Sequence, residues 1–229
     1  EIYTLSLHDA LPILVSHELK TPIALIKGYV STLRRDDVEW EREIVSESLA
    51  VIEDEADHLT EMVEDLLDAT RLQAGGLTLK KSELSIPQLA RFLADRYTAQ
   101  TDKHSFVVDF PPDFPTLALD EERIRQVLTN LLNNAIKYSP DGEIRISGKL
   151  RAKDVVVCVS DRGPGIDPRD LPYVFDRFYR SDEAAKTTKG TGLGLYLCRE
   201  IIRAHDGKIW VDENYKDGSC ICFSLPREV

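Results

Sequence analysis

The sequence predicts an α+β protein in which a helical hairpin precedes an α/β domain with helices on one face of a mixed sheet. Three observations predict it. Apolar residues recur at alternating spacings of three and four over residues 49–66, as in a helical seam. Gly75-Gly76 breaks that helix. Helical and strand patterns then alternate as far as Leu225.

The composition narrows the class of function. The 229 residues carry a net charge of -11, which argues against general nucleic-acid binding because that function favours basic faces. Binding of a nucleotide is still compatible with this negative charge, since a local basic group and a metal ion can outweigh the effect of a diffuse acidic surface on the phosphates. No apolar run approaches the roughly 20 residues that span a bilayer. The four cysteines lack zinc-site spacing, and we expect buried free thiols in a reducing compartment.

Residues 1–13 do not fit the helical pattern of residues 14–35. Pro12 removes a backbone donor and clashes with the preceding turn, so we expect a helix to start only near residues 10–12. Our hypothesis is that residues 1–13 are not native but a junction introduced by cloning or sequence assembly.

Two helices are predicted to form the hairpin, at residues 14–35 and 41–72. Apolar residues share one side of the first helix: Ile23, Ile26, Val30 and Leu33. The seam of the second helix consists of Leu49, Ile52, Ala56, Leu59, Val63 and Leu66. One hairpin cannot bury both sets, whereas two hairpins can pair into a four-helix bundle with twofold symmetry. The alternative is a single hairpin packed on the downstream domain.

The second part is predicted from shorter patterns. The expected helices are residues 85–99, with a capping box of Ser85 and Gln88, residues 120–138, capped by Asp120, and residues 193–205. The expected strands are residues 77–80, 105–109, 143–150, 154–161, 208–212 and 219–225. The strands at 143–150 and 154–161 are expected to form a hairpin.

The helix from Asp120 places three polar side chains on one face. Asn130 and Asn134 are four residues apart, and Lys137 lies three residues later. Amide oxygens are ligands that suit Mg²⁺, and an ammonium group suits the phosphates that accompany it. The alternative is an ordinary polar helix face in solvent.

A carboxylate followed by glycines ends the strand at 154–161. Asp161 can accept a hydrogen bond from an exocyclic amine, and Gly163 and Gly165 let a flat ring approach the backbone. Asp-x-Gly-x-Gly is also a common turn, which remains the alternative.

A second glycine-rich stretch opens the helix at 193–205. It reads Gly190-Thr191-Gly192-Leu193-Gly194, and backbone N–H groups at a helix start can face an anion. It is not a P-loop, because the spacing of that motif is absent. Upstream, Phe175 and Phe178 are expected to anchor a segment whose Arg180 meets phosphates, although a plain amphipathic turn is the alternative.

The stretch Val15-Ser16-His17-Glu18-Leu19-Lys20-Thr21-Pro22 resembles the H box, or phosphoacceptor site, of bacterial sensor histidine kinases. Further boxes come after it in family order. The stretch with Asn130, Asn134, Lys137 and Tyr138 resembles the N box, and the stretch at Asp161 resembles the G1 box. Residues 174–180 resemble the F box, and residues 190–195 resemble the G2 box. Lys189 departs from the glycine that many members carry there.

The resemblance implies a kinase catalytic core with two domains. Residues 14–74 would form the dimerising phosphoacceptor domain, and residues 77–229 an ATP-binding domain of the Bergerat type found in Hsp90 and DNA gyrase. ATP and Mg²⁺ would be bound, with Asn130 and Asn134 as metal ligands and Asp161 on the adenine amino group. Both Gly75-Gly76 and a lid at residues 181–189 would move.

In the same family, the histidine corresponding to His17 takes the phosphoryl group and the acid corresponding to Glu18 orients it. The position of Thr21 implies dephosphorylation of a partner as well. That partner is the receiver domain of a response regulator, and the kinase is a homodimer. The resemblance also implies a cytoplasmic fragment whose parent protein is anchored in the cell membrane through a missing upstream segment.

Two alternatives from other classes remain. A non-kinase ATPase of the same fold would hydrolyse nucleotide without forming phosphohistidine, and the His17 motif and the seam argue against it. A catalytically inactive dimeric scaffold would bind a regulator without ATP. The intact set of Asn130, Asn134, Asp161 and the glycines at 190–194 argues against that alternative.

Overall fold

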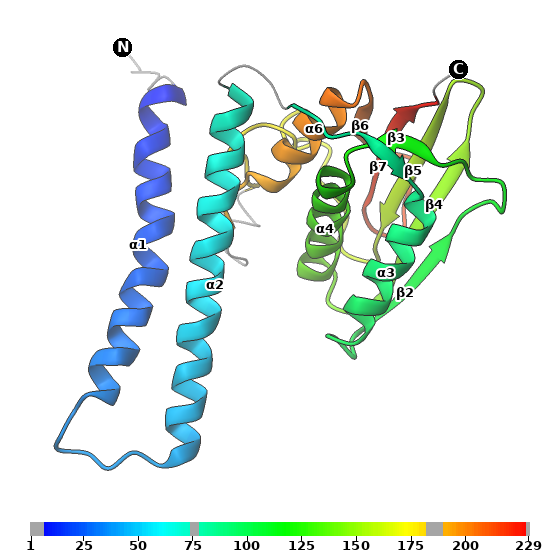
Figure 1. Ribbon diagram of the computed structural model, residues 1–229. Helices are drawn as coiled ribbons and strands as arrows, with labels where there is room; N and C mark the ends of the chain where they lie inside the picture. The colour runs from blue at the N-terminus through cyan, green and yellow to red at the C-terminus, as the bar shows by residue number, and fades with distance from the viewer. Residues whose placement is uncertain (1–6, 74–77, 182–189, 228–229) are drawn as a thin grey trace. The chain divides into compact units, whose positions relative to one another are not determined.

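The computed structural model describes residues 7–73, 78–181 and 190–227. Two compact units make up the chain, Glu1–Asp68 and Ala69–Val229. The first unit is helical, and the second combines helices with two sheets (Figure 1). The predicted order of a helical hairpin followed by an α/β part is therefore confirmed.

Helices α1 (Leu7–Leu33) and α2 (Arg42–Gln73) form the hairpin around a turn at residues 34–41 (Figure 1). α1 begins at Leu7 and continues through Pro12, so the expected start at residues 10–12 was wrong. Pro12 cannot donate to the carbonyl one turn earlier. Ala10, Leu11 and Leu14, which lie within two residues of Pro12, have strong helix propensity, which accounts for a helix that tolerates this one missing hydrogen bond.

Apolar side chains of the predicted seam are open to solvent along the hairpin. Ile23 and Val30 of α1 are 45% and 39% exposed, and Leu49 and Val63 of α2 are 53% and 46% exposed. Repeated exposed apolar residues are typical of a helical surface that pairs with another surface. Among the described helices, none combines enough length with a sufficiently apolar composition to cross a bilayer.

The second unit is built on a five-stranded sheet with the order β2-β4-β5-β7-β6. Its strands are β2 (His104–Asp109), β4 (Gly142–Leu150), β5 (Asp154–Ser160), β6 (Lys208–Val211) and β7 (Cys220–Pro226). β2 and β4 are parallel, and the other neighbours are antiparallel. These five strands match the sequence predictions to within one residue at each end, and the mixed sheet is confirmed.

A separate antiparallel pair joins β1 (Ser82–Leu84) to β3 (Leu117–Leu119). The strand expected at residues 77–80 was misplaced. Leu77 lies outside the described residues, and residues 78–80 do not form part of a β-strand. β3 was not predicted, because a strand of three residues is too short to show an alternating pattern.

Helices α3 (Ile86–Thr98), α4 (Glu121–Tyr138) and α6 (Gly194–Ala204) cover one face of the five-stranded sheet (Figure 1). Alternate residues of the strands point into this core because side chains alternate across a strand. The strands contribute Ile144, Ile146, Val155, Val157, Val159, Ile221, Phe223 and Leu225, and α4 contributes Ile124, Val127, Leu128, Leu131, Leu132 and Ala135. Helices on one face of a mixed sheet are therefore confirmed.

The predicted caps of these helices have different outcomes. Asp120 caps α4, because its side chain accepts a hydrogen bond from the Arg123 N–H. The capping box at Ser85 was wrong, since the Ser85 side chain makes no cap hydrogen bond. The Gln88 N–H, which a capping box would use, donates to the Ser85 main-chain oxygen at 3.1 Å instead.

A smaller cluster lies on the opposite face of the sheet. Its buried residues are Val156, Cys220 and Cys222, and Cys158, Trp210 and Tyr215 pack against them. Cys158 and Cys222, which face each other across β5 and β7, form a disulfide. The expectation that all four cysteines are free thiols was therefore wrong, because 64 residues separate this pair in the sequence and only the strand register joins them. Cys198 and Cys220 are free and buried.

Candidate functional site

Helix α4 supplies the predicted amide and ammonium groups. Its first turn is fixed by Asp120, whose carboxylate also accepts from the Lys80 N–H at 2.8 Å. The apolar side of α4 enters the core, which leaves Asn130 and Asn134 half-buried and Lys137 exposed. The Asn130 amide donates to the main-chain oxygen of Gly194 at 3.4 Å. This contact joins the predicted amide face to the start of α6.

A buried histidine that directly follows α6 supports the N-terminal end of α4. His205 Nε2 accepts a hydrogen bond from the Asp120 N–H at 3.1 Å, and Nδ1 lies 2.8 Å from the Ile201 oxygen. The Nδ1–H is therefore the donor to Ile201, and the ring is neutral. Burial lowers the pKa of His205 below its ordinary value.

Asp161 comes directly after β5 and is 5% exposed. One carboxylate oxygen accepts from the Gly163 N–H at 2.8 Å and from the Ser219 N–H at 3.2 Å. The other oxygen accepts from the Ser219 hydroxyl. The carboxylate is therefore held in one orientation by donors from two loops that lie far apart in the sequence.

Sequence reasoning missed Ser219. It stands just before β7, and the register pairs Ser160 with Cys220, so the residues that flank these two, Asp161 and Ser219, become neighbours. The Asp161 N–H donates to the Ser219 oxygen at 3.0 Å in the same ladder. In the sequence, the only indication of this role was that a hydroxyl residue follows Gly218 at the start of the last strand.

Backbone packs closely around the carboxylate of Asp161. A Cβ atom on Gly163 would lie 2.8 Å from the Tyr138 oxygen and 2.9 Å from an Asp161 carboxylate oxygen. Gly165 has a φ of 81°, which side chains rarely adopt. The predicted glycines are therefore required by the fold of this loop, and the loop meets the C-terminal end of α4 at Tyr138, whose side chain is exposed.

The segment before α6 is tied to the predicted phenylalanine motif. The Phe178 N–H donates to the Gly192 oxygen at 3.0 Å, and both residues have positive φ, 63° and 69°. A Cβ atom on Gly192 would lie 2.7 Å from the carbonyl carbon of Phe178. Phe175 packs against the main core, as the sequence predicted, whereas Phe178 is not among the residues that pack on it.

The same glycine-rich segment reaches α4. A Cβ atom on Gly190 would lie 2.7 Å from Lys137 Nζ, so the ammonium group lies against the backbone of this glycine. Thr191 Oγ1 accepts from the Leu193 N–H at 3.2 Å, and Leu193 is fully buried at the N-terminus of α6. The structure thus brings the α4 face and residues 190–194 together.

Arg180 is half-buried at the end of the phenylalanine motif. An ion pair of 3.1 Å between Arg199 and Asp176 joins the same motif to α6. The lid predicted at residues 181–189 falls, except for Ser181, outside the described residues, as does the Gly75-Gly76 linker.

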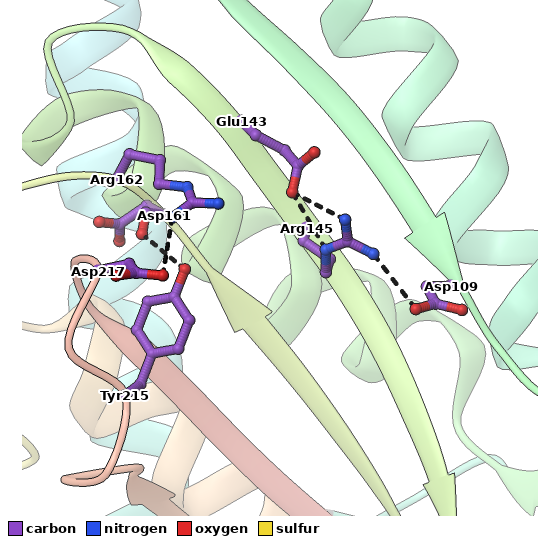
Figure 2. A network of polar contacts seen from close by, with 7 residues as sticks. All are labelled: Asp109, Glu143, Arg145, Asp161, Arg162, Tyr215 and Asp217. Atoms are coloured by element: carbon purple, nitrogen blue, oxygen red, sulfur yellow. Dashed lines mark hydrogen bonds and ion pairs between the residues drawn. The ribbon is translucent and has the colours of Figure 1, made fainter.

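Figure 2 shows the polar contacts around Asp161 and along the open face of the sheet. Arg162 and Asp217 form an ion pair of 2.9 Å, which bridges the two loops that hold the carboxylate of Asp161. Tyr215 donates from its hydroxyl to the main-chain oxygen of Asp161 at 3.3 Å. On β2 and β4, Arg145 pairs with Asp109 at 3.2 Å and with Glu143 at 3.0 Å.

The predicted phosphoacceptor lies in the other unit. His17, Glu18 and Thr21 are all within α1. The side chains of His17 and Glu18 lie outside the part of the chain that is described, and Thr21 is exposed next to a buried Pro22.

Two family models match the chain. The first, "His Kinase A (phospho-acceptor) domain", matches residues 14–75. The second, "Histidine kinase-, DNA gyrase B-, and HSP90-like ATPase", matches residues 119–229. Together they cover both the predicted phosphoacceptor stretch and the site on the second unit.

Known proteins are similar over nearly the whole chain. The Sensor protein SrrB of Staphylococcus aureus (strain N315) is 38% identical over 216 residues, which are 93% of this chain and 37% of SrrB. The chain thus spans little more than a third of that curated relative.

Solved structures are similar as well. Histidine kinase ThkA in complex with response regulator protein TrrA is 26% identical, with a TM-score of 0.76, over 95% of this chain and 61% of that one. The catalytic domain of ThkA alone is 30% identical, with a TM-score of 0.58, over 65% and 96%. Full-length ShkA in complex with AMPPNP is 26% identical, with a TM-score of 0.70, over 94% and 45%.

Proposed function

Because the chain belongs to the family of bacterial sensor histidine kinases, we propose that it transfers the γ-phosphoryl group of ATP to His17. The phosphoryl group then passes to an aspartate in the receiver domain of a response regulator. Residues 14–74 act as the phosphoacceptor domain, and residues 77–229 as the ATP-binding domain.

The arrangement of Asp161 is the observation that carries this proposal. Its buried carboxylate is fixed by Gly163 and Ser219, and it lies at the end of a strand in a loop of closely packed glycines. A carboxylate held in one orientation suits the exocyclic amino group of adenine as a hydrogen-bond acceptor. ShkA, a similar protein, was solved with AMPPNP, an analogue of ATP.

The phosphates are assigned to the glycine-rich segment at residues 190–194. Lys137 lies against Gly190, and Asn130 contacts Gly194, so an ammonium group and an amide lie beside the glycine segment that opens α6. These groups fit a polyphosphate with its divalent cation, because Mg²⁺ prefers oxygen ligands and keeps several waters. Asn130 and Asn134 would hold the ion, whose charge offsets that of the phosphates. Arg180 adds a further positive charge.

His17 acts as the nucleophile through a neutral ring nitrogen. The reference pKa of imidazole, near 6.5, leaves most of the ring neutral at pH 7, so its lone pair can attack the γ-phosphorus. As the N–P bond forms, the bond to the β–γ bridging oxygen breaks and ADP leaves. Glu18 accepts the proton from the other ring nitrogen and orients the ring.

The partners are inferred from the hairpin and the relatives. We assign the exposed apolar seam to a homodimer in which two hairpins form a four-helix bundle. The ThkA structure contains a response regulator, which supports a receiver domain as the second partner. Thr21 is exposed on α1 one turn beyond His17, where it can position water for dephosphorylating the regulator. We also propose that the parent protein is anchored in the cell membrane.

Incubation with γ-labelled ATP and Mg²⁺ tests this function directly. We expect label that is labile in acid and stable in base, as phosphohistidine is, and its loss in His17→Gln. Label that persists in His17→Gln refutes the assignment. Nucleotide hydrolysis without protein label favours a non-kinase ATPase of the same fold, and dimerisation without nucleotide binding favours an inactive scaffold.

A further inference from the structure

We propose that the disulfide between Cys158 and Cys222 is a redox-active site that controls nucleotide affinity at Asp161, with a dithiol as its reducing co-reactant. The inference rests on the proposed function of Asp161. It adds a covalent switch on the face of the sheet opposite the helices.

The position of the disulfide is the first part of the argument. It joins β5 to β7, and these two strands lead directly to Asp161 and Ser219, the pair that fixes the carboxylate. Asp161 lies three residues after Cys158, and Ser219 lies three residues before Cys222. A bond between the strands at this register therefore constrains the spacing of the two loops that build the nucleotide site.

Tyr215 provides a second connection. Its ring packs on the cluster of Val156, Cys220 and Cys222, and its hydroxyl donates to the main-chain oxygen of Asp161 at 3.3 Å. Reduction replaces the S–S bond by two thiols, and two unbonded sulfur atoms must lie farther apart than two bonded ones. The reduced pair therefore needs more room in this cluster. The side chains packed on them must shift, and Tyr215 carries that shift to Asp161.

A third cysteine, Cys220, lies beside the disulfide but does not exchange with it spontaneously. Cys220 Sγ lies 3.8 Å from Cys222 Sγ, close enough to attack it as a thiolate. Burial, followed by the charge of Asp212, raises the pKa of Cys220 to about 11. The thiol is therefore protonated at neutral pH, and exchange within the cluster needs an external thiol.

Cys158 is the accessible half of the bond. It is half-buried, whereas Cys222 is only 2% exposed. A thiolate of the dithiol attacks Cys158 Sγ, forms a mixed disulfide and expels Cys222 as a thiolate, which takes up a proton. The second thiol of the reductant then displaces Cys158. In total, two electrons and two protons pass from the dithiol to the protein, and the dithiol becomes a cyclic disulfide.

The test compares ADP binding by the whole chain before and after treatment with dithiothreitol, with thiol titration to count free cysteines. We expect two free thiols before reduction and four after it, as Cys198 and Cys220 are the free pair. The Kd for ADP should rise about fivefold on reduction, the effect of weakening one hydrogen bond of the site. Cys158→Ala/Cys222→Ala should bind like the reduced protein in both conditions.

Cys220→Ala is the matched control, because it changes the same cluster but retains the disulfide and should respond to reduction like the unaltered chain. Four free thiols in protein treated with an oxidant overturn the proposal, as does an unchanged Kd after the bond has opened. Both measurements use the unaltered chain, so they test the proposal even if the double variant fails to fold. Absence of ADP binding in both redox states would instead refute the proposed nucleotide site.

Discussion

Ser219 donates two hydrogen bonds to Asp161, one from its hydroxyl and one from its backbone N–H, although 58 residues separate them. Each donor meets a different carboxylate oxygen. The orientation of the carboxylate is thus set before any ligand arrives, which lowers the entropic cost of binding.

Asp161→Asn should weaken nucleotide binding more than Ser219→Ala does. The first change removes the negative charge and places an amide N–H group against existing donors, with an expected loss of about 2 kcal/mol or more, or at least about thirtyfold in Kd. The second removes one supporting hydrogen bond, about 1 kcal/mol. Calorimetric titration with ADP measures both. Equal affinity for ADP in Asp161→Asn and the unaltered chain would exclude Asp161 as the adenine acceptor.

Asn134→Asp should abolish labelling of His17 and leave the fold and dimer intact. Asn134 is half-buried on the amide face of α4, and a carboxylate there would repel the phosphates and alter the proposed metal site. Asn133→Asp is the matched control. Asn133 is exposed and accepts a hydrogen bond from the Tyr97 hydroxyl at 2.6 Å, which an aspartate can also accept. Similar labelling of the two variants would contradict the assignment of the α4 face.

Gly192→Ala should destabilise the protein, and Gly194→Ala should not. At Gly192 a φ of 69° and the close approach of Phe178 both oppose a side chain, at a cost of about 1–3 kcal/mol. At Gly194 a Cβ atom would meet Asn130 at 3.8 Å, an ordinary contact, and alanine favours the helix. Denaturant unfolding of the two variants checks the difference. A Gly192→Ala protein as stable as Gly194→Ala would contradict this backbone geometry.

Leu49→Glu should convert a dimer into a monomer. Leu49 is 53% exposed on the seam of α2, and a charge buried in a bundle interface is costly. Sedimentation equilibrium should give twice 25.9 kDa for the unaltered chain and 25.9 kDa for the variant. Phe92→Glu, at a residue of α3 that is 56% exposed, serves as the control and should remain dimeric. A folded unaltered chain that is monomeric at micromolar concentration rules out the bundle.

His205 should make the free energy of unfolding depend on pH. Its pKa is lowered in the fold, chiefly by burial, so the unfolded chain binds the proton more readily. The contribution of His205 to the free energy of unfolding is therefore fully present above the unfolded pKa of about 6.5. It decreases as the pH falls below that value, by up to about 1.4 kcal/mol per pH unit.

Urea unfolding at pH 7.5 and 5.5 measures this dependence, with His205→Gln as the comparison. The variant should be less stable at pH 7.5, since the hydrogen bonds to Asp120 and Ile201 are altered, yet lose less stability on acidification. A variant that loses as much as the unaltered chain would show that another group is responsible.

The sequence by itself determined most of the helices and strands and indicated most residues of the candidate site. Heptad spacing predicted the hairpin, and alternation of apolar residues predicted the five long strands, because local periodicity records which side of an element is buried. The motifs at Asn130, Asp161 and Gly190 are likewise local, so their chemistry was readable before their neighbours were known.

Only the tertiary structure decided the pairings between distant segments. Ser219 meets Asp161, and Cys158 meets Cys222, because β7 lies beside β5 in one particular register. The same is true of Phe178 and Gly192, which share a hydrogen bond across 14 residues of chain. Register depends on the packing of the whole sheet against α4 and α6, and no short stretch of sequence contains that information.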